Sequence, residues 1–281
     1  MLNNLNILLP EIFLTISIFS ALMIGVFIKN SFNLIFNLCS VIILVTIAII
    51  LNNSYSPEKI FLDSFLRDAY SNFFKILILI ASLFVLNSSK AFILDNKLGK
   101  FEYPIIILLS ILGMFFMVSS NDIILFYLGL ELQSLSLYIL ASIDRDNLRS
   151  SESGIKYFVL SALSSGLLLY GCSLLYGFTG STNFDLIANE LNKENVGAVF
   201  AMVFILVGLA FKVSAVPFHM WTPDVYEGAP TSITSYFAVV PKVAGLAVLI
   251  KFMLIPFSNI LFEWQTIIIF ISLASMILGA I

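Results

Sequence analysis

The sequence has 281 residues, of which 60% are hydrophobic and only 11% are charged, and its net charge is −3. Soluble proteins carry about 25% charged residues, so this composition excludes a soluble globular enzyme, and the acidic balance offers no basic face for nucleic acid. We therefore expect an all-α polytopic membrane protein, because apolar helices satisfy their own backbone hydrogen bonds in lipid.

Apolar runs of about 20 residues, the length that spans a bilayer as a helix, recur along the whole chain. Polar segments such as 55–71 separate them. The predicted spans are 7–28, 34–51, 73–89, 103–119, 123–143, 154–179, a seventh that starts near 199, 232–255, and a ninth that starts near 264. The ninth run is still apolar at Ile281, so we expect the sequence to be a fragment or the product of an interrupted gene.

Ionisable residues inside predicted spans point to function, because a charge at the centre of a bilayer costs about 2.5–3.5 kcal/mol on insertion scales. Glu131 lies about halfway along the fifth run and is the only charged residue between Ile123 and Ile143. Two interpretations stay open. Glu131 is either a structural carboxylate that holds two helices together, or a group that carries protons or binds an ion.

Lys212 combines a deep charge with a predicted helix break. It lies about 20 Å into the seventh run at 1.5 Å per residue, and Pro217 follows it. Proline cannot donate to the carbonyl of Val213 and its ring clashes there. A broken helix at membrane depth is tolerated only where it is packed in protein or lines a watery cavity. A functional lysine is therefore favoured over one that extends its amine to the membrane surface.

Three further lysines are interpreted either as members of a proton relay or as anchors at the membrane surface. Lys242 follows Pro241 near the centre of the eighth run and repeats the lysine-and-proline pattern, so Pro241 is predicted to disrupt that helix. Lys251, near the other end of the run, is interpreted as an anchor that extends its amine to the membrane surface. Lys156, at the start of the sixth run, is either a further member of a proton relay or a loop anchor.

The residues that could hold a metal or a redox group are few. His219 is the only histidine and lies near Asp224 and Glu227, in a segment that we interpret as an interfacial loop with a hydrogen-bonding role rather than a metal site. Cys39 and Cys172 lie in apolar runs, and two cysteines cannot ligate an iron–sulfur cluster alone. No glycine-rich phosphate-binding loop is present. We therefore expect no cofactor and no metal in this chain.

Three segments resemble a known family. Residues 212–231, KVSAVPFHMWTPDVYEGAPT, closely resemble the signature of the proton-translocating antiporter-like subunits of respiratory complex I. Residues 128–140, LGLELQSLSLYIL, and 150–161, SSESGIKYFVLS, resemble one member of that family particularly well. The related sodium/proton antiporter subunits share the lysine-and-proline pattern but match less well around Glu131.

The resemblance implies an antiporter-like helical bundle of about 14 spans, with inverted repeats at spans 4–8 and 9–13 that each contain a broken helix. About nine spans are present here. Residues 1–100 would form an N-terminal three-span segment, 101–258 the first repeat, and 259–281 the incomplete start of the second. The resemblance also implies a proton relay of Glu131, Lys212 and Lys242, with Lys156 as a further candidate.

The implied function is that of a membrane-arm subunit that couples electron transfer from NADH to quinone to proton translocation. Its partners would be the other membrane-arm subunits and the lipid bilayer. The FMN, the iron–sulfur clusters and the quinone would belong to the complex rather than to this chain. The location would be a bacterial inner membrane or the mitochondrial inner membrane. The alternatives are a subunit of a cation/proton antiporter complex and an inactive, truncated fragment.

Overall fold

The computed structural model describes residues 6–28, 31–53, 56–96, 98–191 and 196–280, and Ile281, in the ninth predicted span, lies outside these ranges. Within them, nine helical segments are long and apolar enough to cross a membrane, so the predicted all-α membrane architecture is confirmed. The helices are α2 (Leu9–Phe27), α3 (Phe32–Asn52), α4 (Ala69–Asp95), α5 (Glu102–Ser119), α6 (Ile123–Ala141), α7 (Leu148–Thr179), α9 (Val196–Val213), α11 (Thr231–Leu254) and α12 (Leu261–Ala280), the last preceded by the 3-10 turn η1 (Ser258–Ile260).

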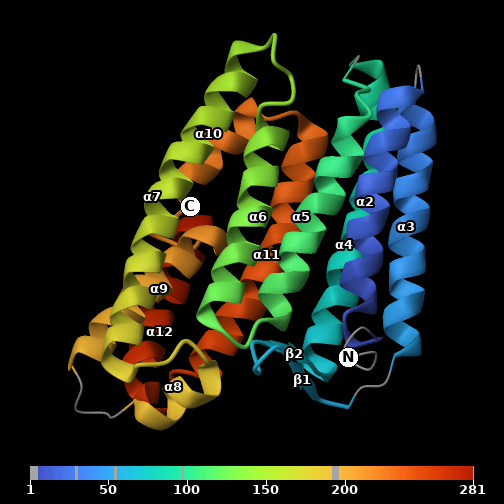
Figure 1. The fold of residues 1–281 in the computed structure, drawn as a ribbon. Coiled ribbons are helices and arrows are strands. Elements are labelled where there is room, and N and C mark those ends of the chain that lie inside the picture. The colour runs from blue at the N-terminus through green and yellow to red at the C-terminus, as the bar shows by residue number, and fades with distance from the viewer. Residues whose placement is uncertain (1–5, 29–30, 54–55, 97, 192–195, 281) are drawn as a thin grey trace.

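Four short elements lie between the spans and were not predicted. The polar segment 55–71 contains an antiparallel hairpin of β1 (Glu58–Ile60) and β2 (Phe65–Arg67). Helix α8 (Phe184–Glu190) follows α7, and helix α10 (Trp221–Gly228) lies in the segment interpreted as a loop. Figure 1 shows β1, β2 and α8 at one end of the bundle, which we call the hairpin face, and α10 toward the opposite end.

Close backbone contact between neighbouring helices forms the centre of the bundle. Helix α5 is the most buried of the described spans, and it lies against α6 (Figure 1). A Cβ atom added at Gly113 would lie 2.5 Å from the backbone nitrogen of Gln133, and one at Gly129 would lie 2.8 Å from the carbonyl oxygen of Gly113. Glycine is needed at both positions because only backbones without side chains can approach this closely.

Two helices begin earlier than predicted. The carboxylate of Asp68 accepts a hydrogen bond from the backbone N–H of Ser71 and caps α4, so α4 starts at Ala69 rather than near Phe73. Helix α7 starts at Leu148 and has 32 residues. At 1.5 Å per residue it is about 48 Å long, well beyond the roughly 30 Å of hydrocarbon in a bilayer. The helix is therefore longer than a bilayer requires, and its first turns lie at the end opposite the hairpin face (Figure 1).

The seventh span is interrupted near Pro217, and the eighth is not interrupted at Pro241. Helix α9 ends at Val213, and Ser214 has a positive φ of 63° that stops it. The next helix, α10, begins at Trp221, whose indole N–H donates to the carbonyl of Phe211 at 3.0 Å. By contrast, α11 runs through Pro241 from Thr231 to Leu254. The expected break at Pro241 is therefore wrong: buried neighbours on both sides hold the helix together, and proline removes only one of its hydrogen bonds.

Candidate functional site

Lys212 is the centre of the candidate site. It is the second-to-last residue of α9, immediately before the break. Its Nζ donates to Ser134 Oγ of α6 at 2.8 Å and to Ser161 Oγ of α7 at 2.7 Å. Both serines are buried, and the hydroxyl of Ser134 in turn donates to the carbonyl of Leu130. Three helices thus converge on one amine, which is solvated by neutral hydroxyls rather than by a carboxylate.

Glu131 lies on α6 three residues before Ser134, and side chains at this spacing share one face of a helix. Its Oε1 atom is buried and has no hydrogen-bond partner in the described part of the chain. Among the described residues, no nitrogen of Lys212 lies within the 4.0 Å that defines an ion pair with this carboxylate. The carboxyl and the amine therefore both lie near Ser134, but they do not form a salt bridge among the described residues.

Lys242 lies on α11 beside the segment that follows the break. Its Nζ is 5.3 Å from the ring centroid of Tyr226 in α10, the distance of a cation–π contact. One turn further along, a Cβ atom added at Gly245 would lie 3.2 Å from Val213 Cγ2, at the end of α9. Lys242 therefore lies on the side of α11 that faces the broken segment. The described residues place no carboxylate within ion-pair distance of its amine.

Lys156 differs from the other three candidates in its exposure and its ion pairs. It is 43% exposed and forms ion pairs with Glu152 at 2.8 Å and with Asp224 of α10 at 2.9 Å. Arg149 and Glu227 approach each other nearby, at 3.9 Å. These pairs tie the start of α7 to α10. The structure thus groups Glu131 and Lys212 around Ser134, places Lys242 against α10, and puts Lys156 in an exposed ion-pair cluster.

The residues considered for a metal do not form one site. Asp224 and Glu227 belong to helix α10 rather than to a loop, and both make ion pairs. No group of three or more histidine, cysteine or acidic residues arranged to hold a metal is found among the described residues. Cys39 and Cys172 are buried on different helices, α3 and α7. The donor set therefore does not fit a haem or an iron–sulfur cluster.

Two features of the hairpin face differ from the sequence-based interpretation. Lys251 is not a surface anchor: it is 4% exposed and donates to the carbonyl of Val118 at 3.1 Å, because α8 and the α5–α6 turn cover the end of α11. Lys75, within the third predicted span, lies inside α4 and makes an ion pair with Glu11 of α2 at 2.5 Å that was not predicted. A charged residue in each of two apolar runs was the signal that could have revealed this pair.

Comparison with known proteins places these features in a family. Residues 120–281 match the family described as NADH:quinone oxidoreductase/Mrp antiporter, transmembrane region. The chain is 57% identical to NADH-quinone oxidoreductase subunit N of Pelagibacter ubique, over 100% of this chain and 60% of the relative. It is 50% identical to the same subunit of Parvibaculum lavamentivorans, over 97% of this chain and 57% of the relative. The chain thus spans less than two thirds of the length of these relatives.

Solved structures show the same architecture. A chain of respiratory complex I from Thermus thermophilus with bound aureothin matches with a TM-score of 0.75 and 29% identity, over 86% of this chain and 52% of the other. A chain of the Mrp complex from a Dietzia species matches with a TM-score of 0.74 and 20% identity, over 90% of this chain and 49% of the other. The Mrp likeness concerns the fold alone, and together the two matches confirm the antiporter-like bundle.

Proposed function

The chain belongs to the NADH:quinone oxidoreductase/Mrp antiporter family of transmembrane subunits, and from this premise we propose that it is part of the membrane arm of a proton-translocating NADH–quinone oxidoreductase. The identity of 57% to a subunit N relative supports this assignment over a cation/proton antiporter complex, because the likeness to the Mrp complex, at 20% identity, concerns the fold alone. The bacterial relatives support a place in a bacterial inner membrane, with other membrane-arm subunits as partners.

In this proposal the chain moves protons and other subunits move electrons. FMN, iron–sulfur clusters and quinone belong to the rest of the complex in this proposal, and the histidine and cysteines here do not form a ligand set for a haem or an iron–sulfur cluster. This chain supplies a membrane-embedded acid, Glu131, and two membrane-embedded amines, Lys212 and Lys242. Burial disfavours a charged amine and a nearby carboxylate favours it. A change in the charge or hydration of one group therefore changes the proton affinity of the next.

The observation that carries the proposal is the environment of Lys212. Its amine lies at a broken helix end and is held by two hydroxyls, one of which belongs to Ser134, three residues after Glu131 on α6. Serine hydroxyls both donate and accept. In the proposed step the Ser134 hydroxyl first turns away from the Leu130 carbonyl. A proton then leaves the Glu131 carboxyl, breaking its O–H bond, and binds Ser134 Oγ, while the hydroxyl proton of Ser134 forms an N–H bond on the neutral amine of Lys212. Lys242, on the α10 side of the break, is the proposed next acceptor.

In this proposal Lys156 has a structural role rather than a place in the proton path. Its ion pairs join α7 to α10, and α10 directly follows the break. In this position Lys156 is better suited to hold the segment after the break than to accept protons from Lys212. The division of the chain into 1–100, 101–258 and 259–281 likewise stays part of the proposal, since it follows from the family's repeats.

The first test asks which proteins the chain travels with. The chain is tagged in its native membrane, solubilised in mild detergent and separated on a native gel that is stained for NADH dehydrogenase activity. Co-migration with that activity is expected. Migration only with other antiporter subunits would contradict the assignment.

The second test asks whether Lys212 takes part in proton movement. Lys212→Met is compared with Lys90→Met, which removes the same charge from a lysine whose Nζ makes an exposed contact with Asn37. Inverted membrane vesicles are supplied with NADH, and proton uptake is followed with a pH-sensitive dye. Loss of proton uptake is expected with Lys212→Met alone. Normal uptake by an assembled Lys212→Met complex would refute the relay.

A further inference from the structure

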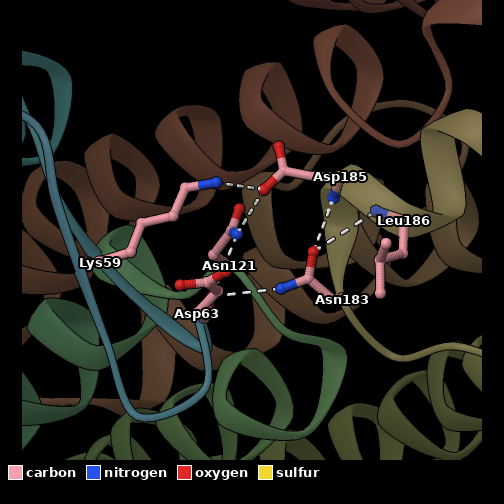
Figure 2. Close-up of polar contacts among 6 residues, drawn as sticks. All are labelled: Lys59, Asp63, Asn121, Asn183, Asp185 and Leu186. Carbon is pink, nitrogen blue, oxygen red and sulfur yellow. Dashed lines mark hydrogen bonds and ion pairs between the residues drawn. The ribbon is translucent and has the colours of Figure 1, made fainter.

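A cluster of polar residues ties three segments together at the hairpin face (Figure 2). We call Lys59, Asp63, Asn121, Asn183 and Asp185 the clasp. Lys59 Nζ lies 2.6 Å from Asp185 Oδ2, and Asn121 Nδ2 donates to the same oxygen at 2.9 Å. The Nδ2 atoms of Asn121 and Asn183 both donate to the carbonyl of Asp63. The side chains of Lys59 and Asp185 are 40% and 45% exposed, so the clasp reaches water.

Lys251 lies buried at the same end of the bundle as the clasp. An ammonium group has three N–H donors, and the described residues give that of Lys251 one acceptor, the carbonyl of Val118. Asn121, three residues beyond Val118 in the α5–α6 turn, is 1% exposed. Its Oδ1 atom is buried and has no hydrogen-bond partner in the described part of the chain. A buried donor with spare hydrogens and a buried acceptor without a partner thus belong to the same end of the bundle.

Ring packing brings Asp185 to the same place. Phe184, the residue before Asp185, packs on Phe252, the residue after Lys251, with ring centroids 4.7 Å apart. The side chain of Asn259 also donates to two carbonyls of α8 and its C-terminal end, those of Ala188 and Leu191. Helix α8 is therefore fixed on the end of α11, which brings an exposed carboxylate close to a buried amine.

The charged groups around Lys251 include one carboxylate, that of Asp185, that is ionised and reaches water. Burial alone would raise the pKa of Asp185, but the hydrogen bonds from Lys59 and Asn121 outweigh burial and hold the pKa below its usual value. Asp68 and Lys75 of α4 are the other charged groups that act on Lys251 at this end of α11. Asp185 is thus ionised at the edge of water, and its lowered pKa means that a proton received there is released readily to water. Lys251, at the same end of the bundle, has no carboxylate within ion-pair distance among the described residues.

We propose that Lys251, Asn121 and Asp185 form a proton-exchange gate between the interior of the bundle and the water at the hairpin face. This gate rests on the proposed proton-translocating function and adds an end point to its path. In the outward direction an N–H bond of the Lys251 ammonium breaks, and a water held by Asn121 Oδ1 passes the proton on. An O–H bond forms on the Asp185 carboxylate, which then loses the proton to bulk water. The amine is left neutral and can accept the next proton.

Two substitutions at Lys251 separate proton exchange from a structural role. Arginine stays protonated in proteins but can still donate to the carbonyl of Val118, whereas methionine can do neither. A gate therefore predicts that Lys251→Arg and Lys251→Met both lose NADH-driven proton uptake in vesicles, as Lys212→Met does, while native gels show assembled complex. A structural lysine predicts that Arg restores what Met loses. Normal uptake with Arg would overturn the gate.

Two more variants keep the gate testable if the Lys251 variants fail to assemble. Asp185→Asn removes the carboxylate charge and its ion pair with Lys59 but keeps the shape of the side chain, and slower proton uptake with a changed pH profile is expected. Normal uptake with Asp185→Asn would overturn the gate by itself. Tyr70→Phe is the matched control, since it removes a neutral hydrogen bond from α4 to the Ala247 carbonyl of α11 and leaves every charge in place. It should pump normally.

The outcomes also separate the gate from the function on which it rests. If Lys212→Met, Lys251→Met and Asp185→Asn all pump normally, the proposed proton translocation through this chain fails. If Lys212→Met loses uptake while the variants of the gate keep it, only the gate fails, and protons leave the bundle elsewhere.

Discussion

The ion pair between Glu11 and Lys75 offers a sharp test of how charges are held inside this bundle. The two atoms that pair are 2.5 Å apart, and both side chains are 2% exposed. Lys75 Nζ also lies 5.2 Å and 5.5 Å from the ring centroids of Phe65 and Phe115. The perturbation is to remove one partner, Lys75→Met or Glu11→Leu, and then both partners together.

The structure sets the expected magnitudes. Removing one partner leaves the other charge buried and unpaired, which costs about 3–5 kcal/mol. Of the two single variants, Glu11→Leu should lose less, because the contact of Lys75 with two rings remains and is worth about 2 kcal/mol when desolvated. Replacing both by apolar residues of similar volume removes the desolvation cost as well, so the double variant should be close to wild type or more stable by about 1–4 kcal/mol.

The assay is the thermal unfolding of the detergent-solubilised complex, followed by the amount of assembled complex left on a native gel after heating. Both single variants should lose assembly at lower temperature than wild type, and the double variant should recover it. A double variant that is as unstable as the sum of the two single variants would refute the reasoning. It would show that each charge has an independent partner or function.

Three further predictions concern the site and the clasp. Glu131→Gln should reduce NADH-driven proton uptake nearly as much as Lys212→Met. Glu131→Asp should keep more activity than Glu131→Gln. Proton uptake by Glu131→Gln equal to that of wild type would exclude a proton-carrying carboxylate. Pro217→Ala restores a backbone donor and should extend α9, with a local gain in helix stability of up to about 3 kcal/mol. Turnover should therefore fall while native gels still show insertion and assembly. Unchanged turnover would mean that the helix break has no role in function. The clasp should stabilise the hairpin face fully above pH 3.8, the ordinary pKa of Asp185, and below pH 10.5, the ordinary pKa of Lys59, because the first is lowered and the second is raised in the fold. Protection of the hairpin from hydrogen exchange should therefore fall as the pH drops through the lowered pKa of Asp185 or rises through the raised pKa of Lys59, and protection that shows neither change would count against the ion pair.

The spans were predictable because their signal is local. Each is a run of apolar residues, and hydropathy and length suffice to find it. The helix break near Pro217 was predictable for the same reason, since proline acts on the helix that contains it. Pro241 shows the limit of that rule. The same residue type lies in an unbroken helix because tertiary packing holds both halves, and packing is not a local property of the sequence.

The partners of the charged residues were not predictable from one sequence. Lys251 was interpreted as a surface anchor from its distance to the end of its run, yet α8 and the α5–α6 turn cover it. The pairing of Lys75 with Glu11 joins positions 64 residues apart, so the sequence alone does not show that they meet. The Ser134 and Ser161 hydroxyls that hold Lys212 are common residues on two different helices, and only the fold shows that they meet.

The backbone at the break is coupled energetically to α12. The amide of Val216, inside the interruption, donates at 3.0 Å to the hydroxyl of Ser275 in α12. The bond is partly buried, and a fully buried donor left without its acceptor costs about 1–3 kcal/mol, which is the upper limit here. A sideways displacement of α12 that breaks this bond therefore destabilises the conformation of the segment that carries Lys212 and the residues after it. By thermodynamic linkage, a change at the break acts on α12 with the same free energy. Through this one hydrogen bond, the position of the ninth span and the geometry around the amine of Lys212 are coupled.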